Sequence, residues 1–211
     1  MPEKTPNLRV DAERNRARVL AAAREIFAEQ GLQAPMSEVA RRAGVGAATM
    51  FRRFPTKEDL VTAVFASKMT AYADAVDEAL NDPDPWRGFC AYVEKVCEMQ
   101  AADRGFADVL TVTFPMAKAF EAERNRAGAG FADLIARAKA AGRLRADFVH
   151  QDLVMVLMAN AGVVSATTEA AQDTWRRLVA YLVQSFAAEA AAPLPDPATP
   201  SQMYRALLRL A

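Results

Sequence analysis

Apolar residues in this chain recur at intervals of three and four, and glycine or proline interrupts the pattern at only a few points. The pattern is clearest over residues 11–30, which end directly before Gly31. One face of that segment carries Val19, Ala22, Ala23, Ile26 and Phe27. Such spacing gives a helix an apolar stripe that must be buried against other helices, whereas alternating β-branched residues are almost absent. The sequence therefore predicts an all-α protein.

The same spacing predicts a series of further helices. Glycine ends two of them, at Gly44 and Gly142, and Thr56 with Glu58 and Asp59 behind it is a typical helix start. The expected helices cover residues 35–43, 47–54, 57–80, 85–101, 103–112, 115–141, 150–168 and 171–190.

A proline-rich tail follows the last long helix. Residues 193–200 contain four prolines and predict an extended linker, and residues 201–210 predict a short amphipathic helix. We expect this helix to pack on its own chain, with binding to a partner as the alternative. The expected domains are 1–56, 57–190 and the tail, 191–211.

Length and hydropathy argue against a membrane protein. With 211 residues, 52% of them hydrophobic, the chain can bury a substantial core. Its longest apolar run, 153–166, is interrupted by Asn160 and is shorter than the roughly 20 residues that a membrane span needs. The polar N-terminus lacks the apolar segment of a secretory signal, so we expect a cytoplasmic protein.

Cysteine and histidine are too few to indicate a redox or metal site. Cys90 and Cys97 lie seven residues apart on one predicted helix, about 10 Å along its axis, which is too far for an unstrained disulfide. We interpret both as buried apolar thiols rather than redox groups. His150 is the one histidine, so we expect neither a metal nor another cofactor.

The formal net charge of zero conceals an asymmetry. Residues 1–57 contain 11 Lys or Arg and 6 Asp or Glu, whereas the remainder contains 15 and 20. The N-terminal part is therefore the candidate for a surface that faces phosphate.

Residues 36–54, MSEVARRAGVGAATMFRRF, have the spacing of a helix-turn-helix. Ala40 is small where two helices must approach closely, and Gly44 stands where the chain must turn through a left-handed conformation. A small core that sets the angle between the helices is expected from Val39, Ala43, Val45 and Met50.

The opposite face of the second of these helices is suited to a DNA major groove. Small residues at its start allow a close approach to base edges, and Arg52 and Arg53 are long enough to reach phosphates or guanines. Lys57 is placed for a phosphate. The candidate DNA-binding residues are Ser37, Gly46, Ala47, Ala48, Thr49, Phe51, Arg52, Arg53 and Lys57.

Residues 14–60 resemble the DNA-binding domain of TetR/AcrR-type transcription regulators. The resemblance rests on R-x-x-x-L-x-A-A-x-x-x-F-x-x-x-G, V-A-x-x-A-G-V and F-P-T-K-E-D-L, which together cover three helices and the start of a fourth. It implies operator DNA as a partner and a C-terminal domain that dimerises and binds a small effector. It also implies that regulation is mostly repression.

The resemblance carries over to single positions in the predicted recognition helix. Thr49 matches the threonine that opens its exposed part, and Lys57 matches a lysine that meets a phosphate. Phe51 stands where tyrosine is usual, so a hydroxyl contact to phosphate is lost there. Arg53 replaces a usual histidine or tyrosine and can restore such a contact by charge.

The run from Arg143 to Val163 resembles the segment that leads into the dimer-forming helices of a TetR subgroup. Helices near 150–168 and 171–190 from two subunits would then form a four-helix interface. The alternative is an intramolecular core.

The effector would occupy a cavity among the C-terminal helices. For each candidate, ordinary core packing is the alternative, although Asn160 is a polar group on an apolar face and needs partners if buried. The side chains of the candidate cavity residues favour a small apolar or aromatic ligand. The candidate ligand-binding residues are Trp86, Phe89, Phe106, Leu110, Phe114, Phe120, Phe131, Met155, Met158 and Asn160.

Two other classes of protein are alternatives to a ligand-sensing regulator. An enzyme has little support, because the sequence has no nucleophile elbow, phosphate-binding glycine loop, zinc helix or dinucleotide fingerprint. A helical adaptor or chromosome-architecture protein would use the same DNA-binding unit without a ligand. An enclosed apolar cavity in the C-terminal part would distinguish a sensor from an adaptor.

Overall fold

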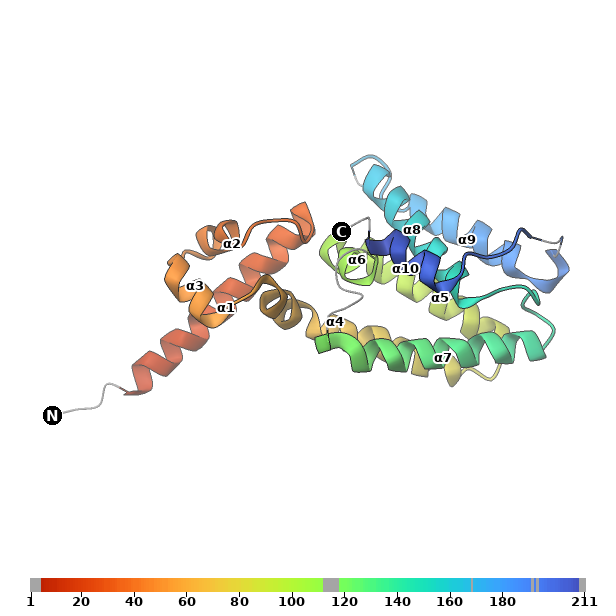
Figure 1. The fold of residues 1–211 in the computed structure, drawn as a ribbon, viewed down its shortest axis with the longest axis horizontal. Helices are drawn as coiled ribbons and strands as arrows, with labels where there is room; N and C mark the ends of the chain where they lie inside the picture. The colour runs from red at the N-terminus through yellow and green to blue at the C-terminus, as the bar shows by residue number, and fades with distance from the viewer. Residues whose placement is uncertain (1–4, 112–117, 168, 191, 193, 209–211) are drawn as a thin grey trace. The chain divides into compact units, whose positions relative to one another are not determined.

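The computed structural model describes all residues except 1–4, 112–117, 168, 191, 193 and 209–211 (Figure 1). The described chain is helical, as the apolar spacing predicts. It also contains one isolated antiparallel bridge between Leu144 and Ala187. It forms two compact units, Met1–Ser67 and Lys68–Ala211, which we call unit 1 and unit 2. None of the described helices is long and apolar enough to cross a membrane.

Unit 1 contains α1 (Thr5–Gln30), α2 (Met36–Ala43), α3 (Ala47–Arg53) and the first part of α4 (Lys57–Leu80). The apolar stripe of α1 is buried, and the rings of Phe27 and Phe65 stack with their centroids 6.2 Å apart. Val39 and Met50 are fully buried and bring α2 and α3 onto this core. The predicted small core of the helix-turn-helix is therefore confirmed, except that Val45 is only half-buried.

The turn between α2 and α3 depends on Gly44. Its φ of +62° is left-handed, and its N–H donates to the carbonyl of Arg41 at 3.1 Å. The Val45 N–H closes the turn by donating to the Ala40 carbonyl at 3.0 Å. Arg18 of α1 donates to the Gly44 carbonyl at 3.3 Å, so the turn is also held to α1.

An ion-pair cluster on the surface joins α1 to α2. Arg42 contacts Glu29 at 3.2 Å and Glu25 at 3.4 Å. The hydrogen bond from Arg42 lowers the pKa of Glu29 below its ordinary value. The ion pairs of Arg42 therefore hold α2 against α1 in unit 1.

The start of α4 is a reciprocal cap. The Asp59 N–H donates to the Thr56 hydroxyl at 3.1 Å, and the Thr56 N–H donates to the Asp59 carboxylate at 3.0 Å. The prediction of a helix start at Thr56 is confirmed. This arrangement satisfies donors that a helix N-terminus otherwise leaves unpaired.

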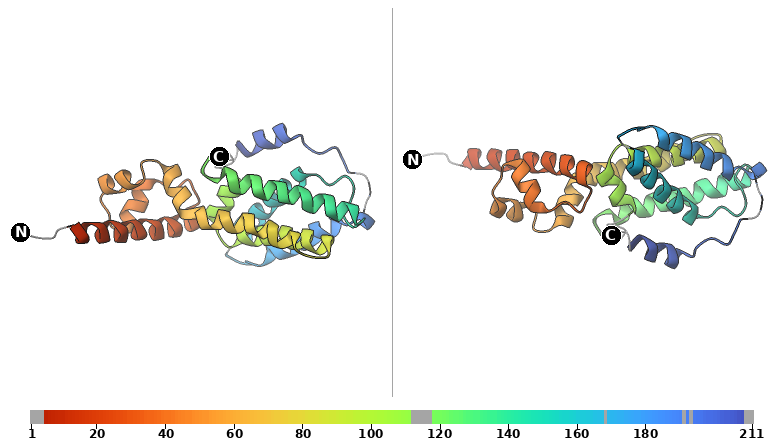
Figure 2. Two further views of the ribbon diagram at one scale, coloured as in Figure 1. Left: turned by 90° about the horizontal axis from the view of Figure 1, so that it is seen from below. Right: turned by 90° about the horizontal axis from the view of Figure 1, so that it is seen from above.

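Unit 2 is built around α5 (Pro85–Ala101), which contacts α6 (Arg104–Thr111), α7 (Glu121–Ala140), α8 (His150–Thr167) and α9 (Thr174–Phe186). The second part of α4 lies beside α7 in Figures 1 and 2. The two helices approach closely at Gly130, where a Cβ would come within 2.8 Å of the Val76 side chain.

Some predicted helix bounds were wrong. Residues 115–117 of the expected helix over 115–141 lie outside the described residues, and Lys118–Phe120 form a 3-10 turn before α7 begins at Glu121. Glu121 and Glu123 lie in the first turn of α7, where the helix dipole favours acids. α1 begins at Thr5 rather than residue 11, and α9 covers only Thr174–Phe186, with a separate 3-10 turn at Ala188–Ala190.

The tail returns to unit 2. The buried side chain of Arg145 donates to the carbonyl of Ala192 at 2.7 Å and to that of Ser185 at 3.3 Å. The final helix, α10 (Pro200–Leu208), contacts α8, and its Met203 is buried. The tail helix therefore packs on its own chain, as expected.

We predict that Gly44→Ala destabilises unit 1 by about 1–2 kcal/mol, because an L-residue is strained in the left-handed conformation. The new Cβ would also lie 2.6 Å from the Arg18 guanidinium. Urea denaturation followed by far-UV circular dichroism measures the loss. Both tryptophans, Trp86 and Trp175, lie in unit 2, so their fluorescence reports on that unit alone.

Gly46→Ala is the matched control two residues away. Gly46 has an ordinary φ of −67° and no atom within 4 Å of an added Cβ. Its substitution should cost less than half as much as Gly44→Ala. Equal losses for the two variants would contradict the role given to the left-handed turn.

Candidate nucleic-acid interface and effector region

The predicted recognition face lies on α3. Met50 is fully buried and fixes the rotation of this short helix. The residues on its other sides are therefore turned outward, and Phe51 is 49% exposed. Exposed with it are Ala47, Ala48, Arg52 and Arg53, whereas Thr49 is half-buried.

The remaining predicted DNA-binding residues lie at the starts of helices in unit 1. Ser37 is exposed in the first turn of α2, and Gly46 is exposed as the N-cap residue of α3. Lys57 opens α4 and is half-buried, and this burial lowers the pKa of its ammonium group. Helix starts present unpaired N–H groups and a positive dipole end, which suits them to phosphate.

A groove of about 270 Å³ separates α1 from α3 within unit 1. Arg52 and Arg53 of α3 line one side, and Asn15 and Arg16 of α1 line the other. Sequence reasoning did not assign a role to the two α1 residues. Their positions continue the buried stripe of α1 toward its N-terminus, which is a signal that could have indicated them.

The predicted ligand-binding residues separate into several groups. Phe89 and Phe131 are fully buried, and their ring centroids are 5.9 Å apart. Trp86 stacks on Phe89 at 5.6 Å, and Phe148 meets Phe89 edge-on at 5.2 Å. These residues form one aromatic cluster in the core of unit 2, to which sequence reasoning did not assign Phe148.

Asn160 is fully buried and joins α8 to α5. Its side-chain N–H groups donate to the Cys97 carbonyl at 3.1 Å and to the Gln100 side-chain oxygen at 3.0 Å. The Asn160 oxygen and the Gln100 side-chain nitrogen have no partner among the described residues. Gln100 was missed by sequence reasoning, although it is a polar residue within the apolar stripe of Phe89, Val93 and Val96.

The other predicted ligand-binding residues are spread over α6, α8 and the 3-10 turn before α7, and Leu110 packs against the core that contains the aromatic cluster. Phe106 and Phe120 are buried, Leu110 and Met158 are half-buried, and Met155 is 49% exposed on α8. Met155 instead lines an apolar cleft of about 210 Å³ with Phe148, Phe186 and Leu194. Phe114 lies outside the described residues.

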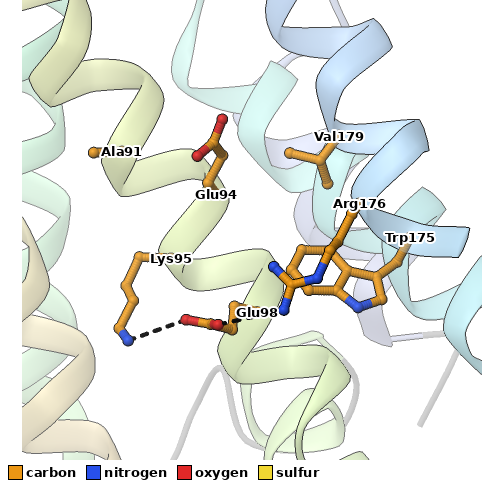
Figure 3. Close-up of a pocket in the computed structure, with 7 residues that line it drawn as sticks. All are labelled: Ala91, Glu94, Lys95, Glu98, Trp175, Arg176 and Val179. Atoms are coloured by element: carbon orange, nitrogen blue, oxygen red, sulfur yellow. Dashed lines mark hydrogen bonds and ion pairs between the residues drawn. The ribbon is translucent and has the colours of Figure 1, made fainter. Parts of the chain in front are cut away.

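A wider surface groove of about 400 Å³ lies between α5 and α9 (Figure 3). The Arg176 guanidinium lies 4.5 Å from the centre of the Trp175 ring, and it contacts Glu98 at 3.6 Å. Lys95 donates to the same Glu98 at 3.1 Å, which lowers the pKa of that carboxyl. These three charged groups satisfy one another across the groove.

Burial shifts the pKa values of the two thiols and of the imidazole. Burial raises the pKa of Cys90 and of Cys97 to about 12, so both remain protonated near neutral pH. Burial also lowers the pKa of His150, which favours the neutral imidazole. The described residues contain no cluster of three or more His, Cys, Asp or Glu that could hold a metal ion.

Two family models match the chain. The one described as "Bacterial regulatory proteins, tetR family" matches residues 19–64, which include α2, α3 and the predicted recognition face. The one described as "Transcriptional regulator SbtR-like, C-terminal domain" matches residues 84–185 of unit 2. The chain belongs to the TetR family of transcription regulators. The proposed resemblance is thus confirmed, and members of this family are DNA-binding regulators rather than enzymes.

Known TetR-family proteins are similar to this chain over different lengths. A TetR regulator from Streptomyces coelicolor is 28% identical, with a TM-score of 0.50, over 82% of this chain and 98% of that one. The Fatty acid metabolism regulator protein of Bacillus subtilis (strain 168) is 32% identical over 65 residues. That match takes in 30% of this chain and only about a third, 34%, of the relative.

A third similar structure is that of the regulator FadR from Bacillus subtilis in complex with stearoyl-CoA. It has a TM-score of 0.52 and 17% identity, and the alignment covers 83% of this chain and 99% of that one. At this identity the likeness concerns the fold alone.

Proposed function

We propose that this TetR-family regulator represses transcription from an operator and is released by a small apolar or aromatic ligand. In this proposal residues 1–56 are the DNA-binding domain, and residues 57–190 bind the ligand and dimerise. The observation that carries the proposal is the exposed face of α3, with small residues at its start and, at its end, two arginines that have no partner among the described residues.

The division of labour on that face follows from side-chain size. Ala47 and Ala48 would let the helix approach base edges, and Thr49 would offer a hydroxyl to them. Phosphates or guanines would be contacted by Arg52, Arg53 and Lys57. The helix starts at Ser37 and Gly46 would lie against the phosphate backbone of the DNA. Phe51 would contribute packing against sugar or a thymine methyl.

We predict that Ala48→Leu weakens binding to a duplex selected from a random library by tenfold or more, because a bulky side chain holds the helix away from the bases. Binding to a scrambled duplex should not change. Fluorescence anisotropy at fixed salt measures both affinities. Ala21→Leu, at an exposed position on α1, is the control and should match the unchanged protein. Equal weakening on both duplexes would contradict base readout by α3.

The Asn160–Gln100 pair supports a ligand with an apolar body and a hydroxyl or amide group. The pair leaves one buried acceptor and one buried donor without partners among the described residues. Unpaired buried polar groups are costly, and a ligand that offers both a donor and an acceptor would satisfy them. The stearoyl-CoA complex of FadR is a precedent for a ligand with a long apolar body on this fold.

In the ligand test, stearoyl-CoA and each of a series of monocyclic phenols are added separately to the complex of the protein with the selected duplex. We predict that at least one compound lowers DNA affinity tenfold or more. Asn160→Leu should weaken the effect of that compound about tenfold, through loss of a buried hydrogen bond. Asn125→Leu, which changes an exposed amide on α7, is the matched control. Tight binding of a compound without any change in DNA affinity would refute regulation by ligand release.

The direction of regulation needs a second readout. A reporter promoter that carries the selected site should lose transcription when the protein is present and regain it when the active compound is added. A rise in transcription with the protein alone would replace repression by activation.

We further propose that α8 and α9 form the homodimer interface. Exposed residues follow one stripe of α8 at Met155, Ala159, Gly162 and Ala166, and Tyr181 of α9 is 56% exposed. Large exposed apolar groups are typical of surfaces that bury against a partner. A twofold pairing of these helices would create a four-helix interface.

We predict that the double variant Met155→Glu, Tyr181→Glu changes a dimer into a monomer of 22.9 kDa, because it would bury four uncompensated carboxylates in the interface. Sedimentation equilibrium at micromolar concentration measures the mass. Val10→Glu, which changes a residue of unit 1 with 43% exposure, is the control and should remain dimeric. A double variant that keeps the dimer mass would exclude this interface.

The two activities would be coupled through α4, which begins in unit 1 at Lys57 and continues into unit 2 to Leu80. Ligand binding would favour a dimer geometry in which the two recognition helices no longer match successive major grooves. DNA and ligand would then oppose each other through a shared conformational equilibrium.

A further inference from the structure

The N-terminal half of α1 extends beyond the core of unit 1. None of the described side chains from Val10 to Ala17 is buried, although the helix begins at Thr5 (Figure 2). The segment from Thr5 to Ala17 has 13 residues and is about 20 Å long, and a helix of this length is marginal in water by itself. Its half-buried residues, Asn15 and Arg16, lie where α1 faces α3.

The groove between these helices is lined by polar groups from both. α1 contributes Asp11, Asn15 and Arg16, and α3 contributes Thr49, Arg52 and Arg53. The α3 positions are spaced by three and four residues, so they belong to one stripe of that helix. The buried Val19 closes the groove where α1 enters the core.

The guanidinium groups of the three groove arginines lack partners among the described residues. Arg16, Arg52 and Arg53 have no hydrogen-bond or ion-pair partner in the described part of the chain, whereas Arg18 is held by the Gly44 carbonyl and Arg42 by Glu29. Asp11 is the one carboxylate in the lining. The groove therefore has a net charge of +2 and free guanidinium donors, which suit a phosphate oxygen.

We infer that this groove holds a phosphodiester of the operator backbone, and that Arg16 of α1 is a DNA contact outside the helix-turn-helix. The inference rests on the proposed function, since α3 in a major groove has a DNA backbone along its flank. Arg16 contacts this backbone together with Arg53, while Asn15 supplies a neutral donor. The DNA backbone would then be the partner of the segment from Val10 to Ala17, none of whose side chains is buried.

The test measures binding to the selected duplex and to a scrambled duplex from 50 to 300 mM KCl. Arg16→Ala should weaken both complexes by about the same factor, on the order of tenfold. Its log–log salt slope should be shallower by about 0.9 for each protomer bound. Asp11→Asn should act in the opposite direction and strengthen both complexes roughly threefold, because it removes a negative charge near the phosphate.

Arg24→Ala is the matched control, since Arg24 is exposed on the same helix but does not line the groove. It should leave affinity and slope unchanged, and Arg16→Lys should keep the slope. Circular dichroism verifies that the variants remain folded.

Different failures are distinguishable. If the unchanged protein binds the selected duplex but Arg16→Ala and Asp11→Asn match it, the groove assignment is wrong and the proposed function stands. Weakening by Arg16→Ala on the selected duplex alone would also overturn a phosphate contact. If the unchanged protein selects no duplex, the proposed function and this inference fail together.

Discussion

Both hydrophobic cores of this chain take side chains from the same helix. In its first part α4 buries Leu60, Val61 and Phe65 in unit 1, and in its second part it buries Val76 in unit 2. A continuous helix transmits a rotation or shift along its length, because its backbone hydrogen bonds resist bending. The proposed coupling between the two units would therefore depend on how α4 packs in each of them.

The orientation of the proposed DNA-binding face of unit 1 depends on the residues that pack beneath it. The buried Met50 and the left-handed turn at Gly44 set the rotation of α3, and the surface pairs of Arg42 join α2 to α1. Arg18 and Arg42 are paired within the fold, whereas Arg52 and Arg53 on α3 have no partner among the described residues. This separation explains how a chain with no net charge can still present a cationic face.

Unit 2 combines a dense aromatic cluster with a small buried polar site. Phe89, Phe131 and Phe148 contact one another as a packed core does, so these rings stabilise the unit whether or not a ligand touches them. Asn160 and Gln100 differ, because each keeps a buried polar atom without a described partner. Polar groups of this kind give specificity at the cost of stability, and the proposed effector site depends on that combination.

The sequence alone determined the helical class, the starts at Thr56 and after Gly44, and the outward position of α3 residues such as Ala48 and Arg53. These are local properties: a repeat of 3.6 residues per turn and the chemistry of a cap are encoded within a few neighbouring positions. Only the tertiary structure placed Gln100 beside Asn160, Arg145 against the carbonyl of Ala192, and Arg16 across a groove from α3. Those pairings depend on how helices distant in sequence pack together. A helical repeat predicts which face of a helix is buried, but it does not predict which other helix covers that face.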